Sequence, residues 1–162
     1  MWRVRARTNA TRVLDRMEVD YTVVEYDLSM ENFSAEAVAN ELGLPAGQVF
    51  KTLCARSNTG ACIFAVVPGG SELDLKKLAR VAGFKKVELV AVRDVDQLTG
   101  YQRGSVTVMA AKKRFPVFVD DSVHAWGTIA VSAGLKGLQV MLSPDDYVRV
   151  TGATVAAIAR PH

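Results

Sequence analysis

The sequence predicts an α/β fold in which a mixed β-sheet is surrounded by helices, and three observations lead to this class. Segments with helical spacing and segments with strand-like composition alternate irregularly along the 162 residues, unlike a regular strand–helix series. Turn signals at 58–60 and 133–137 join neighbouring strand-like runs, which is typical of hairpins. Hydrophobic residues make up 49% of the chain and charged residues 23%, so a sizeable core can be buried. We therefore expect a single domain over residues 1–162.

Helices are expected where a capping residue precedes apolar residues spaced three or four apart and a glycine or proline closes the run. Ser34 and Gly43 bracket one such segment. Ser143 and Pro144 open another, with Ser143 as the N-cap and Asp146 at the third helical position. The predicted helices span 10–17, 35–42, 73–81 and 94–98, and a fifth follows Ser143.

Strands are expected where β-branched, aromatic and other apolar residues run together between turn signals. The segment from Gly100 to Ala111 has no clear pattern, and the tail from Ala153 to Ala159 is short and apolar. The predicted strands span 21–27, 48–56, 61–67, 86–90, 115–120, 128–132 and 138–142.

Composition and motif content exclude several classes of protein. The chain has two cysteines and two histidines, which is too few for a disulfide framework or a zinc site, so we expect no metal and no cofactor. It contains no Walker A loop, no Gly-x-Gly-x-x-Gly fingerprint and no Gly-x-Ser-x-Gly elbow. No signal peptide pattern and no membrane-spanning apolar run occurs, which predicts a cytoplasmic protein. His124 lies near Asp120 and Asp121, but a partly exposed helical histidine explains it without a catalytic triad.

Lys51 is the one charged residue in the apolar run from Val49 to Cys54. A lysine in such a strand either extends from a solvated edge or directs its ammonium into a cleft, because lysine is rarely buried without a partner. Cys54 follows three residues later, which places its side chain on the opposite face of the strand. Cys54 is therefore interpreted as a small core residue and not as a thiol activated by Lys51.

Two glycine-bearing segments, Gly100–Ser105 and Ser132–Gly137, accompany Lys51 as candidate binding loops. Backbone N–H groups in such loops can approach a ligand closely and polarise a carbonyl or hold a phosphate. The same glycines are also explained as ordinary turns, and the spacing alone favours that interpretation. Residue patterns by themselves thus indicate an α/β domain with a cleft that tolerates anions.

A series of short motifs, taken together and in order, resembles the YbaK/EbsC family of aminoacyl-tRNA deacylases, which are relatives of the editing domain of prolyl-tRNA synthetases. Each motif is weak alone, but their order and spacing extend from about Asn9 to Ile158. The motifs are Phe50-Lys51-Thr52-Leu53, Leu73-Asp74-Leu75-Lys76-Lys77-Leu78-Ala79, Lys85-Lys86-Val87-Glu88, Thr99-Gly100-Tyr101, Lys112-Lys113-Arg114 and Val131-Ser132-Ala133-Gly134-Leu135-Lys136-Gly137-Leu138.

The resemblance implies a barrel-like mixed sheet and a trans-editing activity. Such an enzyme releases a wrong amino acid, cysteine first and alanine or another small residue second, from the 3′ end of tRNA(Pro). It implies no metal and no covalent protein nucleophile, and it names aminoacyl-tRNA(Pro) and prolyl-tRNA synthetase as partners. The catalytic residues it implies are Lys51, Tyr26 and Asp146, and the substrate-binding residues are Gly100, Tyr101, Gly104, Ser105, Ser132 and Gly134.

Departures from the family pattern fall in the two candidate loops and keep a second function open. Ser105 and Val108 stand where the family has glycine and proline, and Ala110 and Ala133 replace further glycines. These changes reduce the backbone conformations that the loops can adopt. They therefore affect which amino acid the enzyme is expected to remove. The alternative function is a binding module of the same fold that holds a tRNA acceptor end or a synthetase without catalysis. Tyr26 and Asp146 also have a purely structural interpretation. Tyr26 can be a residue at the edge of the core, and Asp146 can be a carboxylate that caps a helix.

Overall fold

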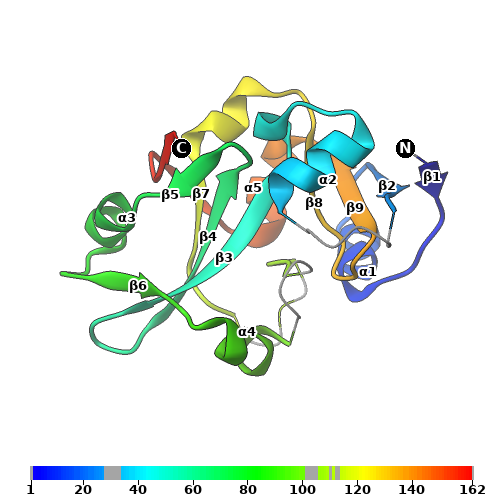
Figure 1. Ribbon diagram of the computed structural model, residues 1–162. Coiled ribbons are helices and arrows are strands. Elements are labelled where there is room, and N and C mark those ends of the chain that lie inside the picture. The colour runs from blue at the N-terminus through cyan, green and yellow to red at the C-terminus, as the bar shows by residue number, and fades with distance from the viewer. Residues whose placement is uncertain (1, 28–33, 101–105, 110, 112–113, 162) are drawn as a thin grey trace.

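The computed structural model describes residues 2–27, 34–100, 106–109, 111 and 114–161. Within these ranges, two β-sheets face each other and helices cover their outer surfaces (Figure 1). None of the helices in these ranges is long and apolar enough to cross a bilayer.

Five α-helices lie in the described ranges, and their ends follow the capping signals of the sequence. The hydroxyls of Thr8, Ser34 and Ser143 each accept a hydrogen bond from a backbone N–H in the first turn of the helix that follows. Glycines in the left-handed conformation end four of the helices, because this conformation is costly for other residues. The helices are α1 (Asn9–Arg16), α2 (Ala35–Leu42), α3 (Leu75–Ala82), α4 (Val92–Thr99) and α5 (Pro144–Thr151), with 3-10 turns η1 (Ala46–Gln48) and η2 (Asp121–Ala125).

The first sheet has the strand order β1-β2-β9-β8, and all of its pairs are antiparallel. The turn between β8 and β9 is the predicted hairpin at 133–137. Its strands are β1 (Trp2–Val4), β2 (Tyr21–Glu25), β8 (Ile129–Ser132) and β9 (Leu138–Leu142).

The second sheet has the order β10-β7-β4-β3-β6 and is mixed. Strands β3 and β4 form the predicted antiparallel hairpin, whereas β7 is parallel to both β4 and β10. The strands are β3 (Phe50–Ser57), β4 (Cys62–Pro68), β6 (Val87–Leu89), β7 (Val117–Asp120) and β10 (Thr154–Ala156). A separate two-stranded pair joins β5 (Ser71–Leu73) to β11 (Ala159–Pro161).

A single parallel bridge between Val49 and Ala130 connects the two sheets. It places the beginning of β3 beside β8, so that the strands continue from β1 through β8 into β3 and the second sheet. The largest apolar cluster lies between the sheets and contains Phe50, Phe64, Val140 and Tyr147. This arrangement confirms the expected α/β class and its mixed, barrel-like sheet.

The outer faces of the two sheets carry separate apolar clusters. Helix α2 covers the outer face of the first sheet, where Val24, Tyr26, Val49 and Ala130 pack against it. Helix α3 and Ile158 cover the outer face of the second sheet. Strand β3 therefore begins under α2 and continues under α3.

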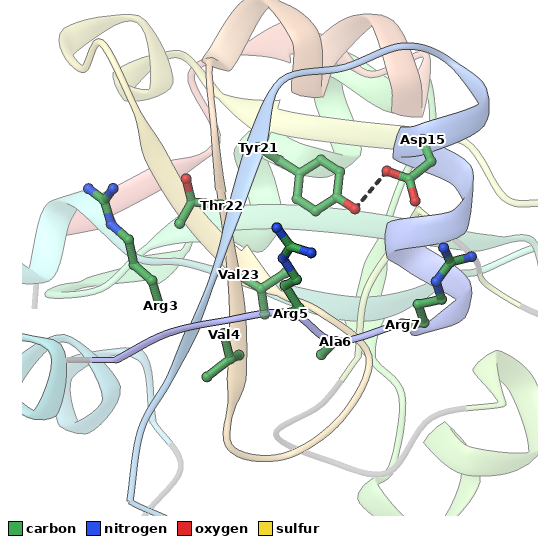
Figure 2. Close-up of a pocket in the computed structure, with 9 residues that line it drawn as sticks. All are labelled: Arg3, Val4, Arg5, Ala6, Arg7, Asp15, Tyr21, Thr22 and Val23. Atoms are coloured by element: carbon green, nitrogen blue, oxygen red, sulfur yellow. Dashed lines mark hydrogen bonds between the residues drawn. The ribbon is translucent and has the colours of Figure 1, made fainter.

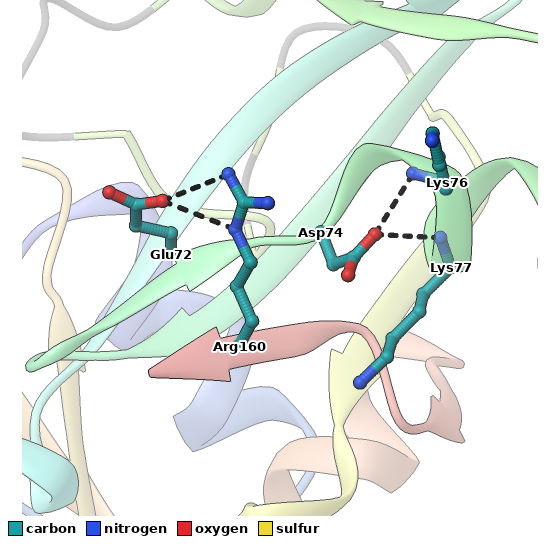
Figure 3. A network of polar contacts seen from close by, with 5 residues as sticks. All are labelled: Glu72, Asp74, Lys76, Lys77 and Arg160. Atoms are coloured by element: carbon teal, nitrogen blue, oxygen red, sulfur yellow. Dashed lines mark hydrogen bonds and ion pairs between the residues drawn. The ribbon is translucent and has the colours of Figure 1, made fainter. Parts of the chain in front are cut away.

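The C-terminal strand β11 is held against β5 by polar contacts as well as by backbone pairing (Figure 3). Both Nε and Nη2 of Arg160 donate to one carboxylate oxygen of Glu72, at 3.2 and 3.1 Å. Asp74 caps α3 by accepting from the backbone N–H groups of Lys76 and Lys77, each at 3.1 Å.

The structure differs from the predicted elements mainly at short edge segments. The predicted helix at 73–81 begins only at Leu75, because Leu73 belongs to β5 and Asp74 is the N-cap. The predicted strand at 115–120 begins at Val117. Strands β1, β5, β10 and β11 were not predicted, since three residues are too few for a recognisable periodicity.

Candidate active site

Lys51 lies on β3 opposite Val67 of β4 and is half-buried. Alternation along the strand puts it on the outer face, between Val49, which packs under α2, and Leu53, which packs under α3. Among the residues that the structure describes, no carboxylate or other acceptor pairs with its ammonium. Lys51 thus occupies the seam between two covered surfaces, with a cation available to a ligand.

Strand register brings Lys51 into line with polar residues far away in the sequence. Val24 pairs with Gln139, and Gln139 pairs with Ser132. The parallel bridge at Val49 and Ala130 puts Lys51 level with Ser132, two residues further along both strands. Because directly opposed residues point to the same side of a sheet, Gln139, Ser132 and Lys51 share the outer face. We call these three residues and Val24 the polar row.

Gln139 is a residue that the sequence analysis did not single out. Its side chain is only 4% exposed, and its Oε1 atom has no hydrogen-bond partner among the described residues. A buried amide oxygen without a partner costs free energy. An unpaired buried acceptor requires an explanation, such as an ordered water or a bound ligand, and this one lies in line with an unpaired lysine.

Tyr26 lies one step beyond the polar row on the same face. Its backbone N–H donates to the carbonyl of Gly137 at 2.9 Å, which extends the pairing of β2 with β9. Its side chain is 4% exposed within the cluster under α2, and its hydroxyl is buried without a partner among the described residues. The apolar packing agrees with a core-edge residue, whereas the unpaired hydroxyl requires a further explanation.

The turn at 133–137 closes the polar row at the end of β8 and β9. The hydroxyl of Ser132 accepts from the N–H of Gly134 at 3.1 Å. Gly134 and Gly137 both have positive φ values, of 94° and 91°, which are strained for residues with a side chain. Ala133 is fully buried in the core between the sheets, so it fits where the family pattern has glycine.

The other predicted binding loop is described only at its first residue. Gly100 ends α4 in the left-handed conformation with a φ of 78°, and its N–H donates to the carbonyl of Asp96 at 2.8 Å. This contact explains Gly100 as a helix terminator. The remaining predicted binding residues, Tyr101, Gly104 and Ser105, lie outside the described residues.

Asp146 lies at the third position of α5, and its backbone N–H donates to the Ser143 hydroxyl at 3.1 Å. Its carboxylate pairs with Arg149 at 3.3 Å on the helix surface. The next residue, Tyr147, packs into the core between the sheets, which is the face of β3 opposite Lys51. These contacts account for Asp146 as a capping residue, and its catalytic role stays a prediction.

Cys54 and His124 occupy positions that fit their structural interpretations. Cys54 is buried, and burial together with neighbouring Cys62 raises the pKa of its thiol to about 11. It therefore stays protonated and weakly nucleophilic near neutral pH. His124 is exposed on η2, while Asp120 accepts hydrogen bonds from the backbone N–H groups of Ile158 and Ala159. In the described ranges, no three His, Cys, Asp or Glu side chains gather as metal ligands would.

Gly69 lies at the rim of the site, between the predicted strand at 61–67 and the predicted helix at 73–81. Its N–H donates to the carbonyl of Val49 at 2.8 Å. A Cβ atom at this position would lie 2.6 Å from the carbonyl oxygen of Ala46, which no side chain tolerates without a shift. The next N–H, of Gly70, donates to Glu36 on α2 at 2.7 Å. The loop after β4 thereby fixes the start of β3, two residues before Lys51.

The chain is similar to proteins that are named as aminoacyl-tRNA deacylases. The chain is 40% identical over 152 residues to EbsC of Enterococcus faecalis, a candidate Cys-tRNA(Pro)/Cys-tRNA(Cys) deacylase by its name, and the match covers 94% of this chain and 93% of that protein. A relative from Escherichia coli K12, named a multifunctional Ser/Thr-tRNA deacylase, is 25% identical over 142 residues, with 85% and 83% covered.

Solved structures share the fold over nearly the full length. A crystal structure titled as a hypothetical protein, APE2540, has a TM-score of 0.86 at 23% identity and covers 94% of this chain and 100% of its own. A candidate trans-editing enzyme for prolyl-tRNA synthetase, by its title, has a TM-score of 0.80 at 24% identity, with 96% and 99% covered. Residues 31–150 match the aminoacyl-tRNA editing domain family. This span includes Lys51, Ser132, Gln139 and Gly69, and Val24 lies before it in the sequence. The chain belongs to the aminoacyl-tRNA editing domain family.

Proposed function

We propose that this protein is a trans-editing deacylase that hydrolyses the ester of a mischarged tRNA(Pro), with cysteine as the first amino acid and alanine or another small residue as the second. Membership of the editing family and the resemblance to deacylases supply the class of reaction. The observation that carries the proposal is the polar row, where an unpaired lysine lies in register with a buried, unpaired amide oxygen.

Lys51 is proposed to bind the terminal adenosine of the tRNA through its phosphate or ribose. An ammonium is a compact point charge that suits a phosphate oxygen. Binding holds the ester beside the reacting groups, so its translational and rotational entropy is lost before the chemical step. The activation free energy of that step is lower as a result. Lys51 is therefore a binding and positioning cation, and the proposal needs no covalent protein nucleophile.

Gln139 and Tyr26 are proposed to hold the aminoacyl group. The α-ammonium of an aminoacyl ester is a donor that can satisfy the Oε1 atom of Gln139. The Tyr26 hydroxyl can accept from the same ammonium or orient a water. In simple hydrolysis that water attacks the ester carbonyl, and the ribose oxygen leaves with the proton. A cysteine substrate offers a second route: its own thiol attacks the ester carbonyl, the bond to the ribose oxygen breaks, and that oxygen takes up the thiol proton, leaving a cyclic thioester that water then opens to free cysteine.

Size and polarity of the amino acid are set by the same contacts. Tyr26 packs under α2 among small side chains such as Ala35 and Ala39, and we propose that only a small amino acid is accommodated beside it. A thiol or hydroxyl on the substrate can reach the unpaired polar atoms of Tyr26 and Gln139. We therefore place cysteine ahead of alanine and include serine among the small residues to be tested.

The deacylation assay tests the proposal directly. Labelled Cys-, Ala- and Ser-tRNA(Pro) are incubated with wild type, Lys51→Ala and Arg56→Ala, with and without prolyl-tRNA synthetase. Arg56 is a matched control because it is an exposed cation on the same strand, five residues further along. We expect Lys51→Ala to reduce release by about 100-fold or more and Arg56→Ala to leave it unchanged.

The assay also separates the two functions that the sequence left open. Release no faster than the spontaneous rate for every ester, with synthetase present, would reject the enzyme. If tRNA binding persisted under those conditions and weakened with salt, the non-catalytic binding module would take its place. The presence or absence of prolyl-tRNA synthetase in the assay further shows whether selection of tRNA(Pro) belongs to this chain or to the synthetase.

A further inference from the structure

The N-terminal segment presents three arginines on one side of an extended chain. Arg3, Arg5 and Arg7 alternate with Val4 and Ala6, and all three arginines are exposed. Figure 2 shows the three guanidinium groups on one side of the segment, with Val4 and Ala6 on the other. In an extended chain, alternate residues lie about 6.6 Å apart. The segment therefore carries a regular series of cations, which we call the arginine strip.

Positive charge is concentrated in this part of the sequence. Residues 1–17 contain five arginines and one aspartate, a net +4, whereas the whole chain has a net charge of +3, so the remaining residues total −1. That single aspartate, Asp15, accepts a hydrogen bond from the Tyr21 hydroxyl at 2.7 Å. Within the described ranges, no ion pair engages the arginine strip. Its three charges are thus available to an anionic partner.

The arginine strip borders an open hollow of about 530 Å³ that the mechanism does not use. Its other lining residues are Val4, Ala6, Asp15, Tyr21, Thr22 and Val23 (Figure 2). Guanidinium groups spread along a concave polar surface favour an extended polyanion over a single small anion, because the charges are too far apart to converge on one group.

Register relates the arginine strip to Lys51. Arg3 pairs with Val24, which is a member of the polar row. Arg3 therefore lies at the far end of the line of residues that leads through Gln139 and Ser132 to Lys51. Four strand spacings of about 4.8 Å separate the two ends, or about 19 Å along the sheet. Because α2 covers the residues between these two ends, about 19 Å is the shortest separation that the unpaired 3′ end of a tRNA, passing outside the helix, has to span.

We propose that the arginine strip binds phosphates of the tRNA acceptor stem while the terminal ester lies at Lys51. The choice of RNA rests on the proposed function. Double-stranded RNA is recognised mostly through phosphates and 2′-hydroxyls, because its major groove does not admit side chains. Arginine suits this task, since its planar fork donates two hydrogen bonds to one phosphate. The contact gives affinity for the stem without reading its sequence.

The test compares two triple variants with the same change in net charge. Arg3→Gln/Arg5→Gln/Arg7→Gln removes the arginine strip. Lys76→Gln/Arg80→Gln/Lys85→Gln removes three exposed cations on and beside α3, which lies at the opposite end of the molecule from β1 (Figure 1). Binding of an uncharged acceptor-stem minihelix is measured against salt concentration. Release of the amino acid is measured on a charged minihelix and on aminoacyl-adenosine, which lacks the stem.

We expect the strip variant to bind the minihelix at least about 10-fold more weakly, and its salt slope to fall by about 2 to 3, as three lost phosphate contacts require. KM for the charged minihelix should rise, with kcat and the turnover of aminoacyl-adenosine unchanged. The α3 variant should behave as wild type. A lysine version, Arg3→Lys/Arg5→Lys/Arg7→Lys, keeps the charges and should retain most of the binding, which guards against loss through misfolding.

Equal weakening in both triple variants, or unchanged binding in the strip variant, would overturn the inference. Wild-type protein that prefers anionic vesicles to the minihelix in competition would overturn it as well, because a membrane surface would then be the partner. If wild type releases no amino acid but its minihelix binding is lost in the strip variant alone, the proposed function fails while the arginine strip stands.

Discussion

Tyr26 and Tyr147 both carry a buried hydroxyl without a hydrogen-bond partner among the described residues. An unpaired buried hydroxyl costs free energy, so each needs either a ligand or compensation from packing. Tyr147 is fully buried in the core between the sheets, and burial raises the pKa of its phenol. Tyr26 lies beside the polar row. The same chemical group thus occurs once in the core and once at the candidate site, which provides an internal comparison.

Replacing each tyrosine with phenylalanine separates the two roles. Tyr147→Phe removes a buried hydroxyl whose one polar neighbour is Thr52, without a hydrogen bond of normal geometry, and we expect the free energy of unfolding to change by less than about 1 kcal/mol, with deacylation unchanged. Tyr26→Phe should be equally well folded but lose about 10-fold in kcat/KM, because its hydroxyl binds the substrate. Denaturant unfolding and the deacylation assay measure both quantities. Equal activity of the two variants would assign Tyr26 to the core edge alone.

The residues of the site differ in how far the sequence could predict them. Lys51 stands out because a charge inside an apolar run is unusual, although only the family resemblance gave it a role. Gln139 lies in Leu-Gln-Val-Met-Leu, which reads as an ordinary alternating strand. Nothing in that pattern says which residues lie opposite it. Its significance depends on the register of three strands that are distant in the chain, and on burial without a partner.

At the scale of the elements, the loop after β4 packs closely against η1. Gly69 approaches the carbonyl oxygen of Ala46 so closely that a Cβ atom would lie 2.6 Å away. Because that neighbour is backbone, it cannot rotate aside. Gly69→Ala should therefore displace η1 and the start of β3, with a loss of about 1–3 kcal/mol in stability and a fall in activity through Lys51.

Gly127→Ala is the matched control for this loop. A Cβ at Gly127 meets nothing within 4 Å, and the residue has no positive φ. We expect its unfolding free energy to stay within about 0.5 kcal/mol of wild type. Urea denaturation of the two variants gives the comparison, and a Gly69→Ala protein as stable and active as Gly127→Ala would show that the rim adapts freely.

Helix α3 depends on a titratable cap, which makes its stability sensitive to acid. The N–H of Lys77, followed by the charge of Lys77 and the N–H of Lys76, holds the pKa of Asp74 below its ordinary value (Figure 3). A carboxyl with a lowered pKa in the folded state stabilises the protein above its unfolded pKa of about 3.9. That contribution is lost as the pH falls through the folded pKa.

Asp74→Ala should accordingly lower the melting temperature at pH 7, and the difference from wild type should disappear as the pH falls below about 4. Thr8→Ala removes the hydroxyl cap of α1, which has no acidic residue in its first turn. Its effect should stay nearly constant over the same range, because a hydroxyl does not titrate there. Thermal unfolding followed by circular dichroism between pH 3 and 7 is the measurement, and a constant Asp74→Ala deficit would contradict the assignment.

At the scale of the molecule, the predicted class and most helices are confirmed, whereas the way the sheets join could not be predicted. Capping residues and glycine stops are local signals, so the sequence locates α1, α2 and α5 closely. The bridge between Val49 and Ala130 joins segments 81 residues apart, and it decides that Lys51 lies level with Ser132. The short strands β1 and β10 pair with the longer strands β2 and β7, whereas β11 pairs with the equally short β5.

One buried carboxylate adds to the strand pairing that joins the C-terminal part of the molecule to the second sheet. Asp120 ends β7 and is 5% exposed. Its Oδ1 atom accepts from the N–H groups of Ile158 and Ala159 at 3.0 and 2.9 Å, and Oδ2 accepts from Ser122 at 3.2 Å. The sequence suggested Asp120 only as a neighbour of His124. Its contacts instead fix the segment between β10 and β11.

Asp120→Ala should therefore lower the free energy of unfolding by about 3 kcal/mol, since buried backbone donors lose a charged acceptor. Asp120→Asn keeps one acceptor oxygen and should lose less. Asp121→Ala, at the exposed neighbouring position, is the control and should stay within about 0.5 kcal/mol of wild type. Urea denaturation measures the totals, and hydrogen exchange should show loss of protection first at Ile158 and Ala159. Uniform loss of protection across both sheets would mean that the C-terminal segment does not open separately, and that Asp120 stabilises the molecule as a whole.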